Sequence, residues 1–397
     1  MAGAATLVAP AFLSHKDYDM NNAWLDHNAP YYCALQVVPS LAEGFCGEGK
    51  TQIAAALSKA LNRRFVLLIA SQCAPEDVAG MPAPDNKSGV TRMLPPYWYD
   101  DVREAGGFVF ADEMTTPVPS VRAPFLSVFS EFKVGQYFMH PDTIVCGAFN
   151  PPDLAPNGSP LEPAMANRFF HHKWQMNKDA WLSGVCDPEQ PLNWKAPEFP
   201  IVPSNWQDYL GIWSPLVGEF LRSHDGLYTQ QPKDGELAFA SYRTWTYAIK
   251  CLAAAEASGA EMYENTSVVR KMVAGCVGVN AAHQFCEWMR TRNLARIEDL
   301  LDGTAVFNHN DDRPDITLCI AAAITTAVGL PSKFTPDRWD RAAAIIGKIG
   351  NECSPEIALK HNKKLREAAV ANGYRPKAAA LKPLLDLMDT VDALLAK

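Results

Sequence analysis

Short runs of consecutive apolar residues recur in the first part of the chain. The clearest are residues 65–70, 107–111 and 143–148, and they alternate with stretches that have helical spacing. Runs that are apolar at nearly every position are typical of parallel strands covered by helices on both faces. Two further strands are predicted at residues 34–38 and 169–175. This alternation predicts a doubly wound α/β unit with a five-stranded parallel sheet and with ligands at the carboxyl ends of its strands.

The later part of the chain has a different pattern, with apolar residues at helical spacing. A Pro-rich segment at residues 186–204 is typical of a linker and separates the two patterns. Beyond it, helices are predicted at residues 206–224, 242–259, 266–290, 315–328 and again within 337–397. We therefore expect three units: an α/β core over residues 1–185, a helical unit over 186–330 and a helical C-terminal extension over 331–397.

The composition of the 397 residues is that of an ordinary globular protein, with 48% hydrophobic and 20% charged residues. The net charge of −8 argues against a broad surface for binding nucleic acid. No apolar run is long enough to cross a membrane, and the N-terminus lacks the basic leader of a signal peptide. The 10 cysteines form no C-x-x-C pair, and several lie in apolar runs, as buried reduced thiols do. We expect a soluble cytoplasmic protein.

The segment from Gly44 to Thr51 (GFCGEGKT) fits the pattern G-x-x-x-x-G-K-[ST] of phosphate-binding loops. Its glycines let the backbone turn tightly, so that successive N–H groups point at phosphate oxygens. We expect Lys50 to reach the β- and γ-phosphates of ATP and the Thr51 hydroxyl to ligate Mg²⁺. Residues 51–61 have helical spacing, and a helix that starts at the loop directs its positive end at the phosphates. The predicted nucleotide-binding residues are Gly44, Cys46, Gly47, Glu48, Gly49, Lys50, Thr51, Gln52 and Asp112.

Two carboxylates follow the strand predicted at residues 107–111, in the pattern called Walker B. Asp112 is expected to hold the water shell of Mg²⁺ opposite Thr51, and Glu113 to orient and deprotonate the attacking water. Two adjacent carboxylates after a buried strand cost free energy unless a cation or water uses them. The alternative is a solvated turn, but the upstream phosphate-binding loop favours a catalytic role.

The next predicted strand ends in Asn150, before two prolines. This side chain is a candidate for hydrogen bonding to the γ-phosphate or to the attacking water, the role called sensor 1. The alternative is a turn-forming asparagine. His171 and His172 lie on a predicted strand and therefore point to opposite faces, which argues against a shared metal site.

Two arginines are candidates for stabilising the γ-phosphate. Arg168 lies just before the last predicted strand and is a candidate arginine finger for a neighbouring subunit, with Arg122 as a rival and a surface salt bridge as the alternative. Arg243 lies in the first turn of a helix that Ser241 caps. The helix dipole disfavours a cation there, unless an anion such as a bound nucleotide compensates it.

Together these segments resemble an AAA+ ATPase and, within that superfamily, the MoxR branch. The similarity runs from about residue 40 to 300, and it is most diagnostic at residues 71–82 (SQCAPEDVAGMP), 95–98 (PPYW), 111–137 and 161–169 (LEPAMANRF). The last of these is similar to the family segment that carries the arginine finger, here on Arg168. The sequence SYRTW at residues 241–245 resembles the family's sensor 2, here on Arg243, with Tyr242 where proline is usual.

The resemblance implies an AAA+ P-loop core, an α-helical lid, and ATP held between them and the next subunit of a ring, usually a hexamer. It also implies a family insert near residues 76–95 on the substrate-facing side of the ring. Members are thought to be chaperones that remodel or activate a protein partner, often one with a von Willebrand factor A domain. The chain departs from the family at Glu43, Cys46 and Glu48 and past residue 330. A carboxylate at position 48 would weaken phosphate affinity unless it faces away from the loop.

Two other functions are compatible with the same fold. A nucleic-acid motor should carry a basic stripe with interleaved aromatic residues. Lys87 and Arg92 flank the insert, but Asp85 and Glu76 offset their charge. A nucleotide-gated assembly scaffold would lack a catalytic acid or an arginine finger, and candidates for both are present.

Overall fold

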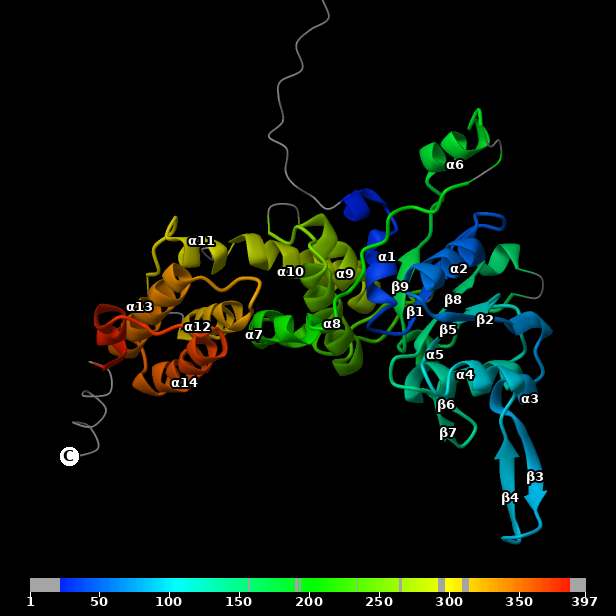
Figure 1. The fold of residues 1–397 in the computed structure, drawn as a ribbon. Coiled ribbons are helices and arrows are strands. Elements are labelled where there is room, and N and C mark those ends of the chain that lie inside the picture. Colours follow the sequence, from blue (N-terminus) through cyan, green and yellow to red (C-terminus); the bar gives the residue numbers. More distant parts are fainter. Residues whose placement is uncertain are drawn as a thin grey trace, which may run out of the picture.

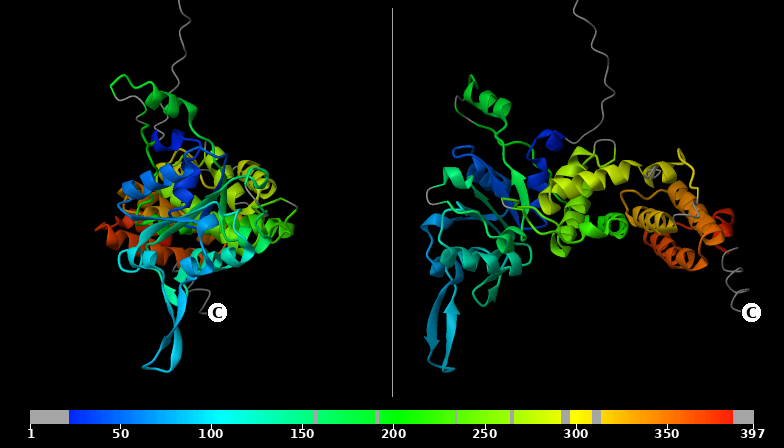
Figure 2. Two further views of the ribbon diagram at one scale, coloured as in Figure 1. Left: turned by 90° about the vertical axis from the view of Figure 1, so that its right-hand side faces the viewer. Right: turned by 180° about the vertical axis from the view of Figure 1, so that it is seen from behind.

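The computed structural model describes residues 22–155, 158–189, 192, 194–233, 235–263, 266–291, 297–308 and 314–385. Within these ranges an α/β part is followed by a helical part. Figure 1 shows the sheet at one end of the molecule and the last helices at the other, and Figure 2 shows the same arrangement from two further directions. Among the described residues, no helix has the length and apolarity needed to cross a membrane.

A five-stranded parallel sheet forms the centre of the α/β part, in the order β2-β5-β8-β1-β9. This confirms the predicted α/β class and the five parallel strands. β1 lies between β8 and β9, so the segment that follows it leaves from inside the sheet. The strands are β1 (Ser40–Glu43), β2 (Arg64–Ile69), β5 (Gly107–Asp112), β8 (Ile144–Phe149) and β9 (Phe170–Lys173).

The strand predicted at residues 34–38 is wrong. Ala34 ends the helix α1 (Ala29–Ala34), turns follow, and β1 begins only at Ser40. Pro39 has no N–H to donate, but its carbonyl accepts a hydrogen bond of 2.8 Å from the Phe170 N–H, where β9 begins. Leu35 is buried in the core that α1 shares with the helical part, so burial explains the apolar run without a strand.

Helices cover both faces of the sheet, and β5 shows the alternation. Phe108 and Phe110 pack in one core with α2 (Lys50–Ala60), whereas Val109 and Ala111 pack in a second core with α4 (Pro119–Glu131). Both faces of the strand are therefore buried, as its continuous apolar sequence predicts. The smaller helices of this part are α3 (Pro75–Ala79), α5 (Pro163–Ala166) and α6 (Lys178–Val185).

A β-hairpin leaves the α/β part directly after α3. Its strands β3 (Met81–Asp85) and β4 (Val90–Leu94) pair in antiparallel fashion and extend away from the sheet (Figure 1). Gly80 starts the hairpin at φ 86°, and an added Cβ there would lie 2.2 Å from the Leu94 carbonyl oxygen. Only glycine fits this close approach of two backbone segments. A second, shorter hairpin consists of β6 (Lys133–Val134) and β7 (Tyr137–Phe138).

The helical part contains the predicted helices, but the short helix α11 (Ile297–Asp302) was not predicted and one predicted helix is divided. The helix predicted at residues 266–290 is divided at Gly278, which has φ 91° and where an added Cβ would lie 2.8 Å from the Ala238 carbonyl oxygen. The described residues of the predicted linker form neither helix nor strand between Cys186 and Ser204, and residues 386–397 of the last predicted block lie outside the described residues. The helices are α7 (Leu210–Ser223), α8 (Tyr242–Ala257), α9 (Ser267–Val277), α10 (Val279–Thr291), α11 (Ile297–Asp302), α12 (Pro314–Gly329), α13 (Pro336–Glu352) and α14 (Pro355–Ala371).

The helical part packs directly against the edge strand of the sheet. Gly275 of α9 lies so close to β9 that an added Cβ would be 2.4 Å from a ring carbon of Phe170. This contact covers β9, which would otherwise be an exposed edge. One hydrophobic core continues from β9 through α8 to α14, so the unit boundaries at residues 185 and 330 stay predictions.

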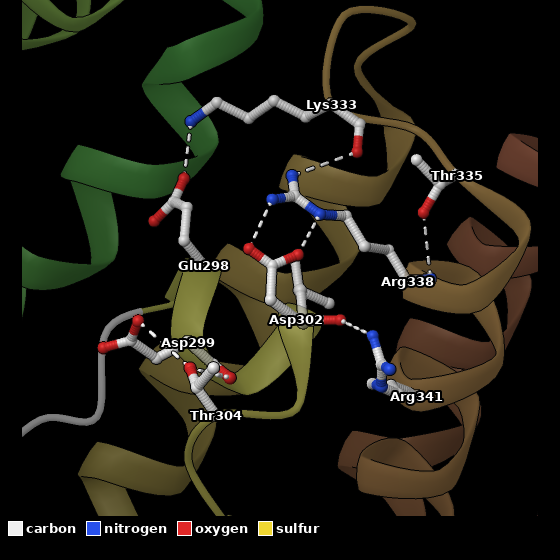
Figure 3. A network of polar contacts seen from close by, with 9 residues as sticks. Glu298, Asp299, Asp302, Thr304, Lys333, Thr335, Arg338 and Arg341 are labelled. Carbon is white, nitrogen blue, oxygen red and sulfur yellow. Dashed lines mark hydrogen bonds and ion pairs between the residues drawn. The ribbon is translucent and has the colours of Figure 1, made fainter. Parts of the chain in front are cut away.

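An ion-pair network joins three segments of the helical part (Figure 3). The Nζ of Lys333 lies 2.8 Å from a carboxylate oxygen of Glu256 on α8 and 2.8 Å from one of Glu298 on α11. Arg338 of α13 donates two hydrogen bonds, of 2.6 and 2.8 Å, to the carboxylate of Asp302 at the end of α11. The Glu256 side chain is buried, so this pair is shielded from salt more than a surface pair would be.

Candidate active site

The predicted phosphate-binding loop connects β1 with α2, the position that its function requires. Gly47 and Gly49 have φ values of 80° and 73°, a conformation that side chains disfavour. Gly49 is the N-cap of α2, so the N-terminal N–H groups of this helix face the loop. Residues 45–47 are exposed, which leaves the loop open to a ligand.

Lys50 folds back over the loop. Its Nζ donates hydrogen bonds of 2.8 Å to the carbonyl oxygens of Gly44 and Phe45 and one of 3.0 Å to Oδ1 of Asn150. Burial lowers the pKa of Lys50, although the nearby Asp112 carboxylate opposes this shift. The structure therefore brings the predicted phosphate-binding lysine and the predicted sensor 1 into direct contact.

Thr51 and Asp112 also meet. The Thr51 hydroxyl donates a hydrogen bond of 2.5 Å to Oδ2 of Asp112, and the Glu113 N–H donates one of 2.8 Å to Oδ1 of the same carboxylate. Hydroxyl and carboxylate oxygens fit a Mg²⁺ ion, which usually takes one or two protein oxygens and completes its shell with water and phosphate. No group of three or more His, Cys, Asp and Glu side chains suited to a metal occurs among the described residues. A cation here would therefore depend on the nucleotide.

Glu113 is held in an unusual backbone conformation, with φ 59°. Its carboxylate accepts a hydrogen bond from the hydroxyl of Ser71. Ser71 lies in a short 3₁₀ helix (Ala70–Gln72) directly after β2, the strand next to β5. No role was predicted for Ser71. A hydroxyl at the carboxyl end of the strand next to β5 is the feature that could have indicated this contact.

Glu48 turns its carboxylate back onto the loop. Its Oε2 accepts a hydrogen bond of 3.2 Å from the Phe45 N–H, and an added Cβ on Gly44 would lie 3.1 Å from the same oxygen. The indole of Trp174, which follows β9, donates a hydrogen bond of 3.0 Å to the Glu48 carbonyl. The buried Trp174, for which no role was predicted, thus holds the loop in place. The Glu48 carboxylate faces the loop and does not point away from it.

Arg168 and Arg243 lie near one another. The hydroxyl of Ser241 donates a hydrogen bond of 2.9 Å to Oδ1 of Asn167, so the residue before Arg168 contacts the N-terminus of α8. Burial raises the pKa of Tyr247, and the positive charges of Arg243 and Arg168 both oppose that shift. Among the described residues, neither arginine forms a hydrogen bond or an ion pair with the phosphate-binding loop.

The rival arginine, Arg122, is buried and occupied within its own subunit. It donates hydrogen bonds of 2.7 Å to the Ser159 hydroxyl and 3.2 Å to the Pro160 carbonyl, and it lies 3.1 Å from a carboxylate oxygen of Glu162. These contacts hold the loop before α5. They engage Arg122 more fully than Arg168, which is half-buried and donates a hydrogen bond to the Ala164 carbonyl of its own chain.

The adjacent histidines of β9 have separate surroundings. The Nε2 of His171 lies 2.8 Å from the Ala166 carbonyl oxygen, and the Nε2 of His172 lies 2.9 Å from Oδ1 of Asn28. Burial lowers the pKa of His171 to about 4 and that of His172 to about 3. Both rings are therefore neutral core residues at neutral pH and share no site.

Comparisons with known proteins leave the family open. No protein-family model matches the chain, and no curated protein matches it. A solved structure with a similar fold is that of a "putative ATPase" from Cytophaga hutchinsonii, at 16% sequence identity and a TM-score of 0.40. The match covers 68% of this chain and 87% of that one. At this distance it assigns neither a family nor an activity.

Proposed function

We propose that this chain is a Mg²⁺-dependent ATPase of the AAA+ type, similar to the MoxR branch. The observation that carries this proposal is the convergence of side chains from the ends of three sheet strands. Lys50 and Thr51 follow β1, Asp112 ends β5, and Asn150 follows β8, with Lys50 bonded to Asn150 and Thr51 to Asp112. These are the groups that phosphoryl transfer requires: a phosphate cradle, a cation site and a polar group for the reacting oxygen.

In this mechanism the loop N–H groups and Lys50 bind the β- and γ-phosphates. Thr51 would ligate Mg²⁺ and Asp112 would hold its water shell, and the ion would supply positive charge to the phosphate oxygens. Glu113 takes a proton from the attacking water, and Asn150 orients that water or the γ-phosphate. The hydrogen bond from Ser71 holds the Glu113 carboxylate at the end of β2.

The two arginines support assembly into a ring. Arg168 and Arg243 make no polar contact with the loop of their own subunit, and Arg243 is exposed in the first turn of α8 without a partner among the described residues. A cation at a helix N-terminus is unfavourable unless an anion lies nearby. We place that anion, the γ-phosphate, on the neighbouring subunit of a homo-oligomer, which the resemblance suggests is a hexamer.

In this proposal, ATP hydrolysis drives the remodelling or activation of a protein partner. The resemblance suggests a partner with a von Willebrand factor A domain. The hairpin β3–β4 supports contact with a protein, because Met81, Val90 and Leu94 are exposed apolar side chains on a projecting element. A nucleic-acid partner is disfavoured here, since Arg92 is paired with Asp85 at 2.9 Å. We expect the protein to act in the cytoplasm.

The substitution Glu113→Gln tests the proposed activity. It should lower ATP turnover by about 100-fold or more, since general-base catalysis contributes at least that factor, while ATP binding is kept. Phosphate release measures turnover, and a fluorescent ATP analogue measures binding. Glu131→Gln, at the end of α4, is the matched control and should leave both unchanged. Turnover that survives Glu113→Gln would contradict the assignment of the base.

A further inference from the structure

A cavity of about 240 Å³ is lined by residues of α7, α12 and α14. Figure 1 shows these three helices in the helical part, away from the sheet that carries the proposed ATP site. The ATPase mechanism uses none of its residues. Its wall is formed by half-buried apolar groups from α7 and α12, namely Pro215, Gly218, Leu318 and Ala322.

Three cationic side chains also line this cavity. Arg222 comes from α7, and Lys360 and Lys364 come from α14, and all three are exposed. Arg222 forms an ion pair of 3.2 Å with Glu219. The two lysines are one helical turn apart, where like charges repel, and neither forms an ion pair with any residue that the structure describes. The mouth of the cavity therefore has two uncompensated positive charges.

His361 adds a polar group from the inside. It lines the cavity, it is only 2% exposed, and its Nδ1 lies 3.0 Å from the Thr325 hydroxyl. Among the described residues, Thr325 is the hydrogen-bond partner of this ring, through Nδ1. Burial, with the charges of Lys364 and Lys360, lowers the pKa of His361 to about 4. The ring is neutral at neutral pH. Because the single proton of the Thr325 hydroxyl is donated to the Ala321 carbonyl at 2.9 Å, Nδ1 donates to the Thr325 oxygen and Nε2 is left as an acceptor.

We propose that this cavity binds a small organic anion, with a phosphate or carboxylate head on a short apolar body. The head pairs with Lys360 and Lys364 at the mouth of the cavity. The body lies on the apolar wall formed by Pro215 and Leu318. The volume is below the range of about 300–1,000 Å³ that is typical of larger ligands, so the body is limited to about one small ring.

Binding would stabilise the packing of three helices that are far apart in the sequence, because a ligand that binds only the folded state raises its stability. The test uses the full chain with the substitution Lys50→Ala, so that phosphate groups do not bind at the ATP loop. The probes are phenyl phosphate and benzoate, which differ in the head, together with phenol, which has the body without a charge, and inorganic phosphate, which has the head without a body. Calorimetry measures affinity, and thermal unfolding measures stabilisation.

We expect phenyl phosphate or benzoate to bind and to raise the unfolding temperature, with phenol and inorganic phosphate at least tenfold weaker. The probe that binds more tightly shows whether the cavity prefers a phosphate or a carboxylate head. Lys360→Gln together with Lys364→Gln should weaken binding of that probe by about tenfold or more. Lys363→Gln is the matched control, because this lysine lies on the same helix but does not line the cavity. If neither aromatic anion binds, or if the double variant binds as well as the control, the proposal is overturned. ATP turnover is measured separately on the chain with Lys50 intact. The result for ligand binding in the cavity therefore does not depend on whether the chain hydrolyses ATP.

Discussion

The hydroxyl of Thr51 donates a hydrogen bond of 2.5 Å to the carboxylate of Asp112, across 61 positions of sequence. This contact fixes the first turn of α2 against the end of β5. It also brings together the two protein oxygens that are best suited to a cation at this edge of the sheet.

Removal of either oxygen should therefore raise the Mg²⁺ concentration that ATP hydrolysis requires. For Thr51→Ala and for Asp112→Asn we expect an increase of about tenfold or more, in line with the energy of a contact to a charged group. A Mg²⁺ titration of turnover at saturating ATP measures this. Thr246→Ala removes an exposed hydroxyl on α8 and is the control. An unchanged Mg²⁺ requirement in both variants would exclude this cation site.

The Glu48 carboxylate should oppose the binding of ATP. It accepts a hydrogen bond from the Phe45 N–H and places a negative charge where phosphates approach. Glu48→Gln keeps the side-chain shape without the charge, so we expect ATP to bind about threefold to tenfold more tightly at low salt, with a smaller gain at high salt because of screening. Binding titrations at two salt concentrations measure this, with Glu104→Gln as an exposed control. Equal or weaker ATP binding would show that the carboxylate does not compete.

Ser71 should act as a positioning residue for Glu113. Without its hydroxyl the Glu113 carboxylate loses a hydrogen bond that positions it. We therefore expect Ser71→Ala to lower kcat by about threefold to tenfold, with little change in ATP affinity. Ser71→Thr retains the hydroxyl and should restore kcat. A purely structural role predicts something different, namely a lower unfolding temperature in Ser71→Ala with no recovery of kcat in Ser71→Thr.

Arg168 and Arg243 should act on the nucleotide of another subunit. Each single substitution to Ala should lower turnover by a factor of about 1,000, the lower end of the range for an arginine finger. Mixing either variant with Lys50→Ala protein should restore part of the activity, because the Lys50→Ala subunit supplies intact arginines to a neighbour with an intact loop. Turnover in the mixture is measured against each protein alone. No recovery at any ratio would mean that the arginines act within their own subunit.

Buried neutral histidines should make the fold sensitive to mild acid. The pKa of His171 is about 4 and that of His172 is about 3 in the folded chain, and both rise to about 6.5 on unfolding. The unfolded chain therefore binds more protons below pH 6.5, and stability is lost as the pH falls. We expect a loss of about 2 kcal/mol for each ring between about pH 7 and pH 5. Urea unfolding at both pH values measures this. His172→Gln should reduce the loss, and the exposed His283→Gln should not.

The sequence predicts the parts of this fold that depend on local pattern. Strands β2, β5 and β8 are continuous apolar runs, and the phosphate-binding loop and the pair Asp112–Glu113 follow strands directly. The error at β1 has a physical cause. The residues before Pro39 are buried by packing of α1 against the helical part, and apolar burial by itself does not distinguish a strand from a helix and a turn.

Contacts between distant segments could not be predicted in the same way. The hydrogen bond of Ser71 to Glu113 requires β2 and β5 to be neighbours, and the support of the loop by Trp174 requires β9 to lie beside β1. The sequence shows each residue but not the strand order. The proximity of Arg168 to Arg243 similarly depends on how α8 docks on the end of α5.

The helix α8 connects two features that are otherwise remote. Arg243 lies in its first turn, and Glu256, which holds Lys333, lies in its last. The 16 residues of α8 form a rod of about 24 Å. Because Lys333 also pairs with Glu298 of α11, one lysine fixes the end of α8 to α11. One helix therefore joins the part of the molecule that carries Arg243 to the C-terminal helices.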